Sequence, residues 1–371
     1  MATKNNDKTL NVPHLRFPEF TGEWKKVRLG DNCNIQMCKR IMAAQTNTEN
    51  GVPFYKIGTI GGKADAYISK ELFDEYKTKY SFPRKGEVMI TCAGTVGKCI
   101  IYNGEDSYYQ DSNIVWIDNP NEILSNDFLY HLLCKVNWSH LNSTTIVRIY
   151  NDDLRNLKLY YPRHNEQKKI THFLQLINER IATQNKIIEK LESLIRGLCL
   201  KLVSQGIPNT ALNTCLECHS SILQEKSVTT DGKYPVYGAA GICGYSNTPE
   251  ASGDSILIIK DGASVGATFY VSGEYSAIGT LNRLTARSGC SLRYLYYCLK
   301  IFDFSQYKTG QTIPHIYFRD YGIAKIWRPS LAQQEHIAGI LTSIDTKIQM
   351  ERSLLERLTI QKRFLLQKMF I

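Results

Sequence analysis

The chain of 371 residues contains one long stretch twice, and this repeat limits what it can fold into. The two copies stand 167 positions apart, and the offset stays constant from residue 145 to the C-terminal end. A period of this size exceeds the roughly 20 to 50 residues of solenoid repeats, so it indicates a duplicated domain. The aligned pairs include Thr145-Ile146 with Thr312-Ile313, Ile149-Tyr150 with Ile316-Tyr317, Pro162 with Pro329, and Gln167 with Gln334.

Upstream of position 145 the two copies match only loosely. Residues 93–97 resemble residues 262–266, and residues 128–130 resemble residues 294–296, at slightly different offsets. Each copy therefore has a variable globular part followed by a constrained tail.

Both tails carry apolar residues at alternating steps of four and three. This is the a/d heptad pattern of a coiled coil, in which one polar residue can fix the register. Gln184 and Glu351 are the equivalent polar positions of the two stripes. The predicted coiled-coil positions are Ile170, Leu174, Ile177, Ile181, Gln184, Ile188 and Leu191 in the first tail, and Ile337, Leu341, Ile344, Ile348, Glu351, Leu355 and Leu358 in the second.

We expect two long helices that pair antiparallel, because their stripes are narrow and of equal length. Residues 330–333 form a capping box directly after Pro329. Gly206 and Pro208 end the first helix, which at ~1.5 Å per residue is roughly 60 Å long. The alternative is that each helix packs on its own globular part.

The globular parts have the pattern of mixed α/β domains. Short apolar strands alternate with glycine-rich loops at 58–62, 93–97, 238–244 and 262–266. Helices are expected at 126–133 and 291–301, and strands at 88–90, 99–102, 114–117, 256–259 and 268–271.

The sequence thus predicts an α+β fold with a pseudo-twofold repeat. Two mixed α/β domains are separated by two long helices that form an antiparallel coiled coil. The predicted boundaries are 1–163 for the first domain, 164–206 for the first helix, 207–329 for the second domain and 330–371 for the second helix.

A formal net charge of +10 favours polyanionic partners such as nucleic acid. Arg and Lys suit guanine edges and phosphates, Asn and Gln suit adenine edges, and glycine-rich turns present backbone N–H groups to phosphates. The candidate DNA-binding residues are Lys39, Arg40, Lys56, Thr59, Lys98, Gln110, Asn113 and Arg148 in the first domain, and Lys226, Tyr237, Lys260, Ser264, Asn282, Arg283, Gln311 and His315 in the second.

Several motifs resemble one known family, the specificity subunits of type I restriction-modification systems. Ile337-Ala338 to Leu341 and Ile344-Asp345, preceded by Pro329 and Gln334, look like that family's repeated region. The segments 234–238, 261–266 and 311–313 resemble its target-recognition domains, as does 13–17 with Trp24 and Leu29-Gly30. The second domain departs from this pattern, because its sequence shows no counterpart of Trp24 and Leu29-Gly30.

The resemblance implies a DNA-reading role without catalysis by the chain itself. Each target-recognition domain would read one half of a bipartite, asymmetric site in double-stranded DNA. Two methyltransferase (modification) subunits and two restriction motor-nuclease subunits would be the partners. They would use S-adenosylmethionine, and ATP with Mg²⁺, to methylate adenine or cleave DNA, whereas this chain would bind no cofactor.

The sequence lacks the motifs of the rival enzyme classes. Asn119-Pro120 is followed by Asn121, so it is a turn and no methyltransferase motif. Cys92 stands where a P-loop before Gly97-Lys98 needs glycine.

Residues 215–219 match a haem-attachment pattern, but no export signal precedes them and no second ligand pair would complete a zinc site. We expect a helix carrying small apolar thiols there.

The remaining alternative is a protein-interaction scaffold that holds two ligand-binding modules on a coiled coil without DNA. The basic charge argues mildly against it. No run approaches the ~18 apolar residues of a membrane span, and the first ten residues are polar. We therefore expect a cytoplasmic protein without a membrane partner, whose 11 cysteines are reduced thiols.

Overall fold

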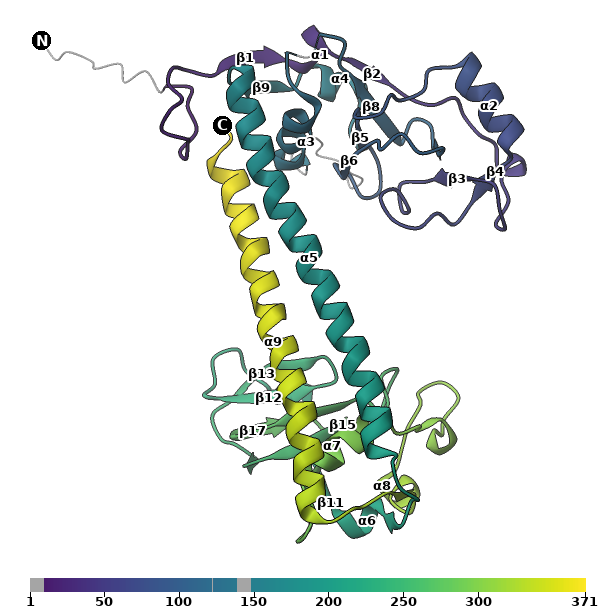
Figure 1. Cartoon of the computed structure of the whole chain (residues 1–371), viewed down its shortest axis with the longest axis vertical. Coiled ribbons are helices and arrows are strands. Elements are labelled where there is room, and N and C mark those ends of the chain that lie inside the picture. Colours follow the sequence, from purple (N-terminus) through teal and green to yellow (C-terminus); the bar gives the residue numbers. More distant parts are fainter. Residues whose placement is uncertain (1–9, 122, 139–147) are drawn as a thin grey trace, which may run out of the picture. The chain divides into compact units, whose positions relative to one another are not determined.

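A computed structural model of the chain describes residues 10–121, 123–138 and 148–371 (Figure 1). The chain divides into unit 1, residues 1–182 with 356–371, and unit 2, residues 183–355. Both long helices cross this division, so each unit contains part of each helix. The aligned pair Thr145-Ile146 lies outside the described residues. Within the described ranges, no helix is long and apolar enough to cross a membrane.

Unit 1 contains one sheet of strand order β2-β8-β5-β6 and another of order β4-β3-β7, and β1 pairs with β9. Helix α3 packs between the first sheet and the long helix α5 (Figure 1). The strands are β1 (Lys25–Arg28), β2 (Asn34–Gln36), β3 (Val52–Tyr55), β4 (Tyr67–Ile68), β5 (Val88–Thr91), β6 (Cys99–Ile101), β7 (Tyr108–Tyr109), β8 (Ile114–Asp118) and β9 (Lys158–Tyr161). The helices are α1 (Leu29–Asn32), η1 (Ala43–Gln45), α2 (Lys70–Lys79), α3 (Asn126–Lys135) and α4 (Asn151–Arg155).

Unit 2 repeats this order, with sheets β11-β18-β15-β16 and β13-β12-β17-β14 and the pair β10-β19. Its strands are β10 (Thr210–Ala211), β11 (Leu216–Ser220), β12 (Tyr234–Gly238), β13 (Gly241–Ser246), β14 (Ala251–Ser252), β15 (Ser255–Ile259), β16 (Thr268–Val271), β17 (Glu274–Ala277), β18 (Leu281–Ala286) and β19 (Lys325–Ile326). Its helices are α6 (Leu212–Cys215), η3 (Glu225–Ser227), α7 (Leu292–Ile301), η4 (Ser305–Tyr307) and α8 (Phe318–Tyr321). The strands predicted at 88–90, 99–102, 114–117, 256–259 and 268–271 and the helices predicted at 126–133 and 291–301 are present.

The start of the globular part of unit 2 corrects one expectation from the sequence. Leu212 is the counterpart of Leu29: each is the buried first residue of a short helix. The backbone N–H of Leu212 donates to the Ala324 carbonyl at 3.0 Å, and that of Leu29 donates to the Leu157 carbonyl at 2.9 Å. The sequence comparison missed this pair because the loops that follow differ in length. In the same register Trp24 aligns with Ile207, which is 86% exposed, so the tryptophan itself has no equivalent.

Two local predictions in unit 2 were wrong. The segment 215–219 is mostly strand β11 and not a helix, because Leu216 to Ser220 pair antiparallel with β18. The segment 238–244 is not an open loop. It forms the hairpin of β12 and β13, with a register shift after Val236.

The long helices are α5 (His164–Val203) and α9 (Leu331–Lys368), of 40 and 38 residues. The capping box at the start of α9 is confirmed. Ser330 N donates to Gln333 Oε1, and Gln333 N donates to Ser330 Oγ, each at 3.4 Å.

In unit 1 the two helices complete a core that the globular part cannot close alone. Ile170, Leu174 and Ile177 of α5 lie in one buried cluster with the C-terminal residues of α9. The Phe370 ring lies 5.1 Å from that of Phe128 in α3 and is 2% exposed. The apolar stripes of the helices therefore pack on the globular part as well as on each other. The two arrangements expected from the sequence, a helix pair and helices packed on their own globular parts, occur together.

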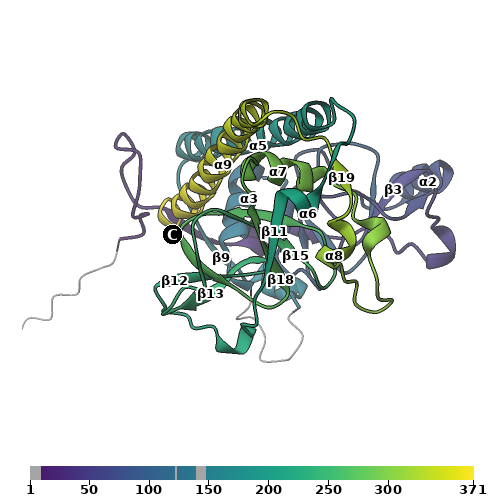
Figure 2. The same cartoon turned by 90° about the horizontal axis from the view of Figure 1, so that it is seen from below.

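Unit 2 is built in the same way. Helix α7 lies between the long helices and the sheet that contains β11, β15 and β18 (Figure 2). The shared core includes Ile195, Cys199 and Val203 of α5 with Ile337, Leu341 and Ile348 of α9.

A buried glutamine joins each long helix to its domain. Gln334 accepts a hydrogen bond from Ser291 N, the N-cap residue of α7, and donates to the Pro329 carbonyl, both at 2.9 Å. Gln167 makes the equivalent bonds to Ser125 N and the Pro162 carbonyl, at 2.8 and 3.0 Å. Both glutamines are 1% exposed. The repeated Pro and Gln positions are thus explained by one polar link that occurs in both units.

We predict that Gln334→Ala lowers the free energy of unfolding of unit 2 by roughly 2 to 3 kcal/mol. The substitution removes two buried hydrogen bonds and leaves the Ser291 N–H and the Pro329 carbonyl without partners. Chemical denaturation followed by circular dichroism measures the change. Gln349→Ala, at an exposed position of α9 within unit 2, is the control and should cost less than about 0.5 kcal/mol. Equal effects of the two substitutions would contradict the link.

His131 of α3 makes the stability of unit 1 depend on pH. Its side chain is buried beside Phe370, its Nδ1 has no hydrogen-bond partner, and burial lowers its pKa to about 4. The unfolded chain takes up a proton below about pH 6.5, whereas the folded state resists it until about pH 4. Stability conferred by neutral His131 is therefore lost as the pH falls between these values.

We predict that unit 1 loses about 3 kcal/mol of unfolding free energy through this group between pH 6.5 and 4. His131→Leu should flatten the slope of stability against pH in that window. Denaturant titrations at several pH values measure it, with His172→Leu on the exposed face of α5 as the control. An unchanged slope in His131→Leu would refute the assignment.

Candidate nucleic-acid interface

In unit 1 several predicted DNA-binding residues gather at the turn 56–60, which follows β3. Lys56 N donates to Thr59 Oγ1 at 3.0 Å, so Thr59 stabilises the turn itself. Lys98 Nζ donates to a carbonyl of the same turn at 2.5 Å. The side-chain oxygen of Gln110 accepts a bond from the turn's backbone at 3.4 Å. These four residues therefore share one loop cluster.

The loop 110–113 holds the remaining polar residues of that cluster. Arg40 Nε donates to Asp111 Oδ2 at 2.7 Å, and Arg148 donates to the Ser112 carbonyl at 3.4 Å. The Asn113 carbonyl accepts a bond from the backbone at the end of β5 at 2.7 Å. This loop holds the two arginines at the end of the sheet where the inner strand β8 begins.

The structure shows acidic and aromatic partners that the candidate set did not include. Asp65 lies 3.1 Å from Lys56 Nζ, and Asp111 pairs with Arg40, so part of the positive charge is neutralised. The Lys39 ammonium lies 5.3 Å from the ring centre of Tyr80. The surface is consequently less basic than its lysines and arginines suggest.

In unit 2 three candidates, Lys260, Asn282 and His315, line one cleft of about 430 Å³. His315 Nδ1 lies 2.7 Å from Asp261 Oδ1, and Asn282 Oδ1 accepts a bond from a β11 serine hydroxyl at 3.1 Å. Burial raises the pKa of Cys218, in the same wall, to about 11, so its thiol stays neutral. The other lining residues are Ser220, Asp261, Tyr317, Phe318 and Arg319.

The other candidates of unit 2 do not join this cleft. Arg283 is the neighbour of Asn282 in β18 and points to the opposite face, because side chains alternate along a strand. There it lines a separate cleft of about 240 Å³. Tyr237 packs against Tyr275 with ring centres 5.9 Å apart. Lys226 of η3 and the loop residues Ser264 and Gln311 are exposed outside both clefts.

Two exposed tyrosines at equivalent positions were missed as candidates. Tyr150 and Tyr317 are 57% and 45% exposed. Each lies beside an arginine: the Arg148 guanidinium is 5.8 Å from the Tyr150 ring centre, and that of Arg319 is 5.0 Å from Tyr317. The sequence did contain a signal for these two tyrosines, because Ile149-Tyr150 and Ile316-Tyr317 are aligned in the repeat.

The predicted seam residues of the two helices are buried or half-buried. Gln184 and Glu351, the equivalent polar positions, meet directly: Gln184 Nε2 donates to the Glu351 carboxylate and, at 3.1 Å, to its carbonyl. Hydrogen bonds from Lys347 and Gln184 lower the pKa of Glu351. The buried positions are Ile170, Leu174, Ile177, Gln184, Ile188, Ile337, Leu341, Ile348, Glu351 and Leu358, and the half-buried ones are Ile181, Leu191, Ile344 and Leu355.

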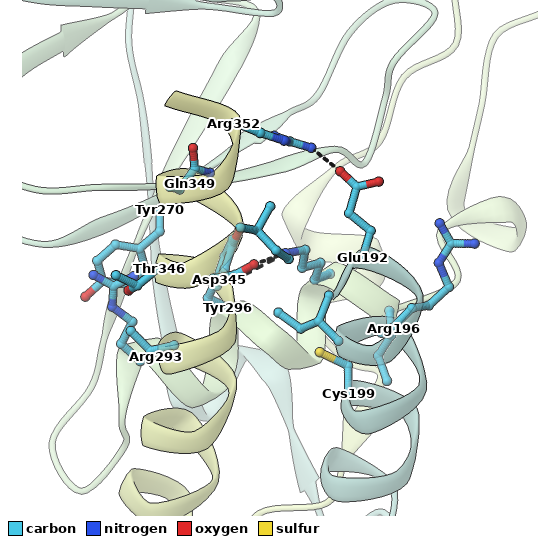
Figure 3. A pocket seen from close by; sticks show the side chains of 15 residues that line it. Glu192, Arg196, Cys199, Tyr270, Arg293, Tyr296, Asp345, Thr346, Gln349 and Arg352 are labelled. Atoms are coloured by element: carbon cyan, nitrogen blue, oxygen red, sulfur yellow. Dashed lines mark hydrogen bonds and ion pairs between the residues drawn. The ribbon is translucent and has the colours of Figure 1, made fainter. Parts of the chain in front are cut away.

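Beside the helices, unit 2 has a groove of about 800 Å³ (Figure 3). Glu192 of α5 and Arg352 of α9 form an ion pair across it at 2.5 Å, and Asp345 accepts bonds from Lys300 and from the Tyr297 hydroxyl. Its walls combine polar and aromatic side chains. Among the residues that the structure describes, no group of three or more His, Cys, Asp or Glu side chains is placed to hold a metal ion.

The duplicated mixed α/β unit with a paired helical tail defines the class of protein, and comparisons with known proteins agree. Residues 21–193 and 217–359 each match the type I restriction modification DNA specificity domain. The solved S subunit of a type I restriction-modification system from M. genitalium covers 97% of this chain and 99% of its own, with a TM-score of 0.67 at 19% identity. A second solved structure, described as concerning complex assembly and conformational transition of the type I R-M system, has a TM-score of 0.57 at 17% identity.

Sequence relatives agree with this class. A Haemophilus influenzae protein, named as type I restriction enzyme specificity subunit S.HindORF215P, is 46% identical over 168 residues, 45% of this chain and 42% of its own length. The MjaVIII specificity subunit of Methanocaldococcus jannaschii is 27% identical over 199 residues, 52% and 44%. The matches span less than half of these relatives.

The chain belongs to the type I restriction modification DNA specificity family and has two target-recognition domains.

Proposed function

We propose that this chain is the DNA-reading subunit of a type I restriction-modification complex. Unit 1 binds one half and unit 2 the other half of a bipartite, asymmetric site in double-stranded DNA. Modification subunits dock on the chain and carry out adenine methylation with S-adenosylmethionine, and motor-nuclease subunits add restriction. The chain itself performs no catalytic step.

The observation that carries this proposal is that the two units share one backbone architecture but carry different polar side chains on equivalent loops. The sheet orders of the units correspond, and so do the glutamine links to α5 and α9. The polar side chains on the equivalent loops differ: Arg148 in unit 1 aligns with His315 in unit 2. Phosphate contacts position a protein on DNA, whereas side chains on such loops select bases, so two different faces imply two different half-sites.

The long helices support a role in setting the distance between the half-sites. Each unit holds segments of both α5 and α9 in its buried core. A change in helix length therefore has to be transmitted to the units. Gln184 and Glu351 are equivalent positions of the repeat and hydrogen bond to each other. This contact supports an antiparallel pairing in which the two helices are related by a pseudo-twofold axis.

Exposed apolar side chains on the helices support partner docking. In unit 2, Ile187 and Leu194 of α5 are 38% and 49% exposed, and Met350 and Leu354 of α9 are 61% and 36% exposed. Ile187 and Leu354 are equivalent positions of the repeat, so each helix exposes an apolar side chain at the same place. Apolar side chains exposed at equivalent places would suit two modification subunits that dock in the same way.

A scaffold without DNA is the competing function. It would show no DNA affinity, whereas charge-based binding weakens steeply as salt rises. The clustering of Arg40, Arg148 and Lys98 at one sheet edge of unit 1 favours the DNA reader.

We predict that one heptad inserted into each long helix at the level of Gln184 and Glu351 lengthens the spacer between the half-sites. Seven helical residues add about 10 Å, which corresponds to about three base pairs. The half-site sequences should stay the same, because the recognition faces are untouched. Mapping of methylated bases in cells that carry the chain with its partner subunits measures the spacer.

The matched control replaces seven residues at the same level without changing the helix length, and its spacer should be that of the wild type. An altered half-site or an unchanged spacer in the insertion variant would contradict the role of the helices.

A further inference from the structure

The groove beside the long helices in unit 2 contains cations that no carboxylate neutralises. Its wall carries four cationic side chains and two carboxylates: Arg196, Arg293, Lys300, Arg352, Glu192 and Asp345. The carboxylates are already paired, Glu192 with Arg352 at 2.5 Å and Asp345 with Lys300 at 3.2 Å. Arg196 and Arg293 form no ion pair with a carboxylate in the part of the chain that the structure describes. Their charges therefore remain for a partner to bind.

Arg293 is held in place by stacking and not by an ion pair. Its guanidinium lies 3.3 Å from the ring centre of Tyr270 in β16. Hydrogen bonds from Tyr270 and Ser272, together with the charge of Arg293, lower the pKa of Asp254, so this carboxylate offsets part of the Arg293 charge from outside the groove. Stacking thus fixes the guanidinium at the wall without neutralising it. Arg293 lies on the α9 side of the groove, and Arg196 lies on α5 (Figure 3).

The equivalent helix of unit 1 carries the opposite charge at the position of Arg293. Helices α3 and α7 have 10 residues each and follow the N-cap serines Ser125 and Ser291, so Arg293 corresponds to Asp127. The N-terminus of a helix has partial positive charge, which favours an acidic side chain in the first turn and disfavours a cation. The folding of α7 therefore does not require this arginine.

Unit 1 also lacks the tyrosine on which the arginine stacks. Ile101 of β6 pairs with Val88 as Tyr270 of β16 pairs with Ile256, so an isoleucine takes the place of the tyrosine. Lys135, the one cation that α3 has at a position where α7 has none, donates to the Phe370 carbonyl at 2.8 Å. The stacked cation of unit 2 is thus replaced in unit 1 by a carboxylate beside an aliphatic side chain.

Exposed apolar side chains lie on the helix turns next to the unit 2 groove. Leu194 is close in sequence to the groove residue Arg196 of α5, and Met350 follows the groove residue Gln349 of α9. Leu194 and Met350 are 49% and 61% exposed. A surface that combines unpaired guanidinium groups with exposed apolar side chains complements a protein segment with carboxylates and apolar side chains, such as an acidic amphipathic helix.

DNA suits this groove less well than an acidic protein segment does. In the sheet of order β11-β18-β15-β16, the cleft with Lys260 is lined from β11 and β18, whereas the groove is lined by Tyr270 of the opposite edge strand β16. The carboxylates Glu192 and Asp345 in the groove wall repel phosphates. Exposed leucine and methionine side chains contribute nothing to a contact with the charged DNA backbone.

We propose that the unit 2 groove binds an acidic segment of one modification subunit, and that unit 1 offers no equivalent contact to the other. The inference rests on the proposed function, in which two modification subunits dock on the chain. Beyond the contacts that both subunits share, Arg196 and Arg293 bind carboxylates of this segment. Asp127 repels the same segment at the equivalent place in unit 1. Two identical modification subunits therefore bind with unequal affinity, and the one at unit 2 binds more tightly.

The test titrates the purified modification subunit into the full chain without DNA, by isothermal titration calorimetry. The wild-type chain should show two sites whose dissociation constants differ by at least about tenfold. The tighter site should weaken more as the salt concentration rises, because its additional contacts are ionic.

Arg293→Asp installs the residue that unit 1 has at the equivalent position. It should weaken the tighter site by at least about tenfold and leave the other site unchanged, so that the two sites become nearly equal. Because α3 carries Asp127 at this position, the substitution is compatible with the start of a helix. Thermal melting checks the fold, and Arg293→Ala, which removes the charge alone, takes over the test if Arg293→Asp does not fold.

The matched control is Lys308→Asp, which changes the charge by the same amount at an exposed position outside the groove. It should alter neither site. Two equal sites in the wild type, or an effect of Arg293→Asp on both sites or on neither, would overturn the proposal. A loss of DNA affinity in Arg293→Asp with unchanged binding of the modification subunit would also overturn it, since the groove would then be a DNA contact.

Failure of the proposed function gives a different result in the same titration. In that case the wild-type chain binds no modification subunit at all, whereas failure of the further inference alone leaves two sites of equal affinity.

Discussion

Neither recognition unit closes its hydrophobic core without segments of both long helices, and the rest of the structure depends on this constraint. Unit 1 buries Phe370, from the C-terminal end of the chain, against α3 of its globular part. Unit 2 buries the end of α5 with the start of α9. The two long helices and the globular parts are therefore expected to fold together, because they share the same buried cores. The buried glutamines Gln167 and Gln334 add a directional polar link to the apolar contacts.

Because the frame is fixed by backbone bonds and buried apolar contacts, the loops at its edge can change side chains without loss of fold. The Asn113 and Thr280 carbonyls accept the same backbone bond in the two units, while the residues that donate it are Cys92 and Lys260. Such a frame accommodates different surface side chains in each unit. It also accounts for the close match of the tails and the loose match of the globular parts.

The sequence predicted the architecture far better than the recognition face. The constant offset identified the equivalent pair Gln184 and Glu351, and these residues hydrogen bond to each other. Periodicity also identified the main strands and helices. It failed at β11, because a short strand resembles a helical segment when its partner strand is unknown. The recognition face depends on long-range contacts, so the ion pair of Arg40 with Asp111 had no local signal.

The central claim is that each unit reads its own half of a split DNA site. Its most direct test exchanges residues 24–160 for the corresponding domain of another member of the family and maps the methylated bases with the same partner subunits. The account predicts that one half-site changes, while the other half-site and the spacer are retained. A change in both half-sites, or in neither, would contradict it.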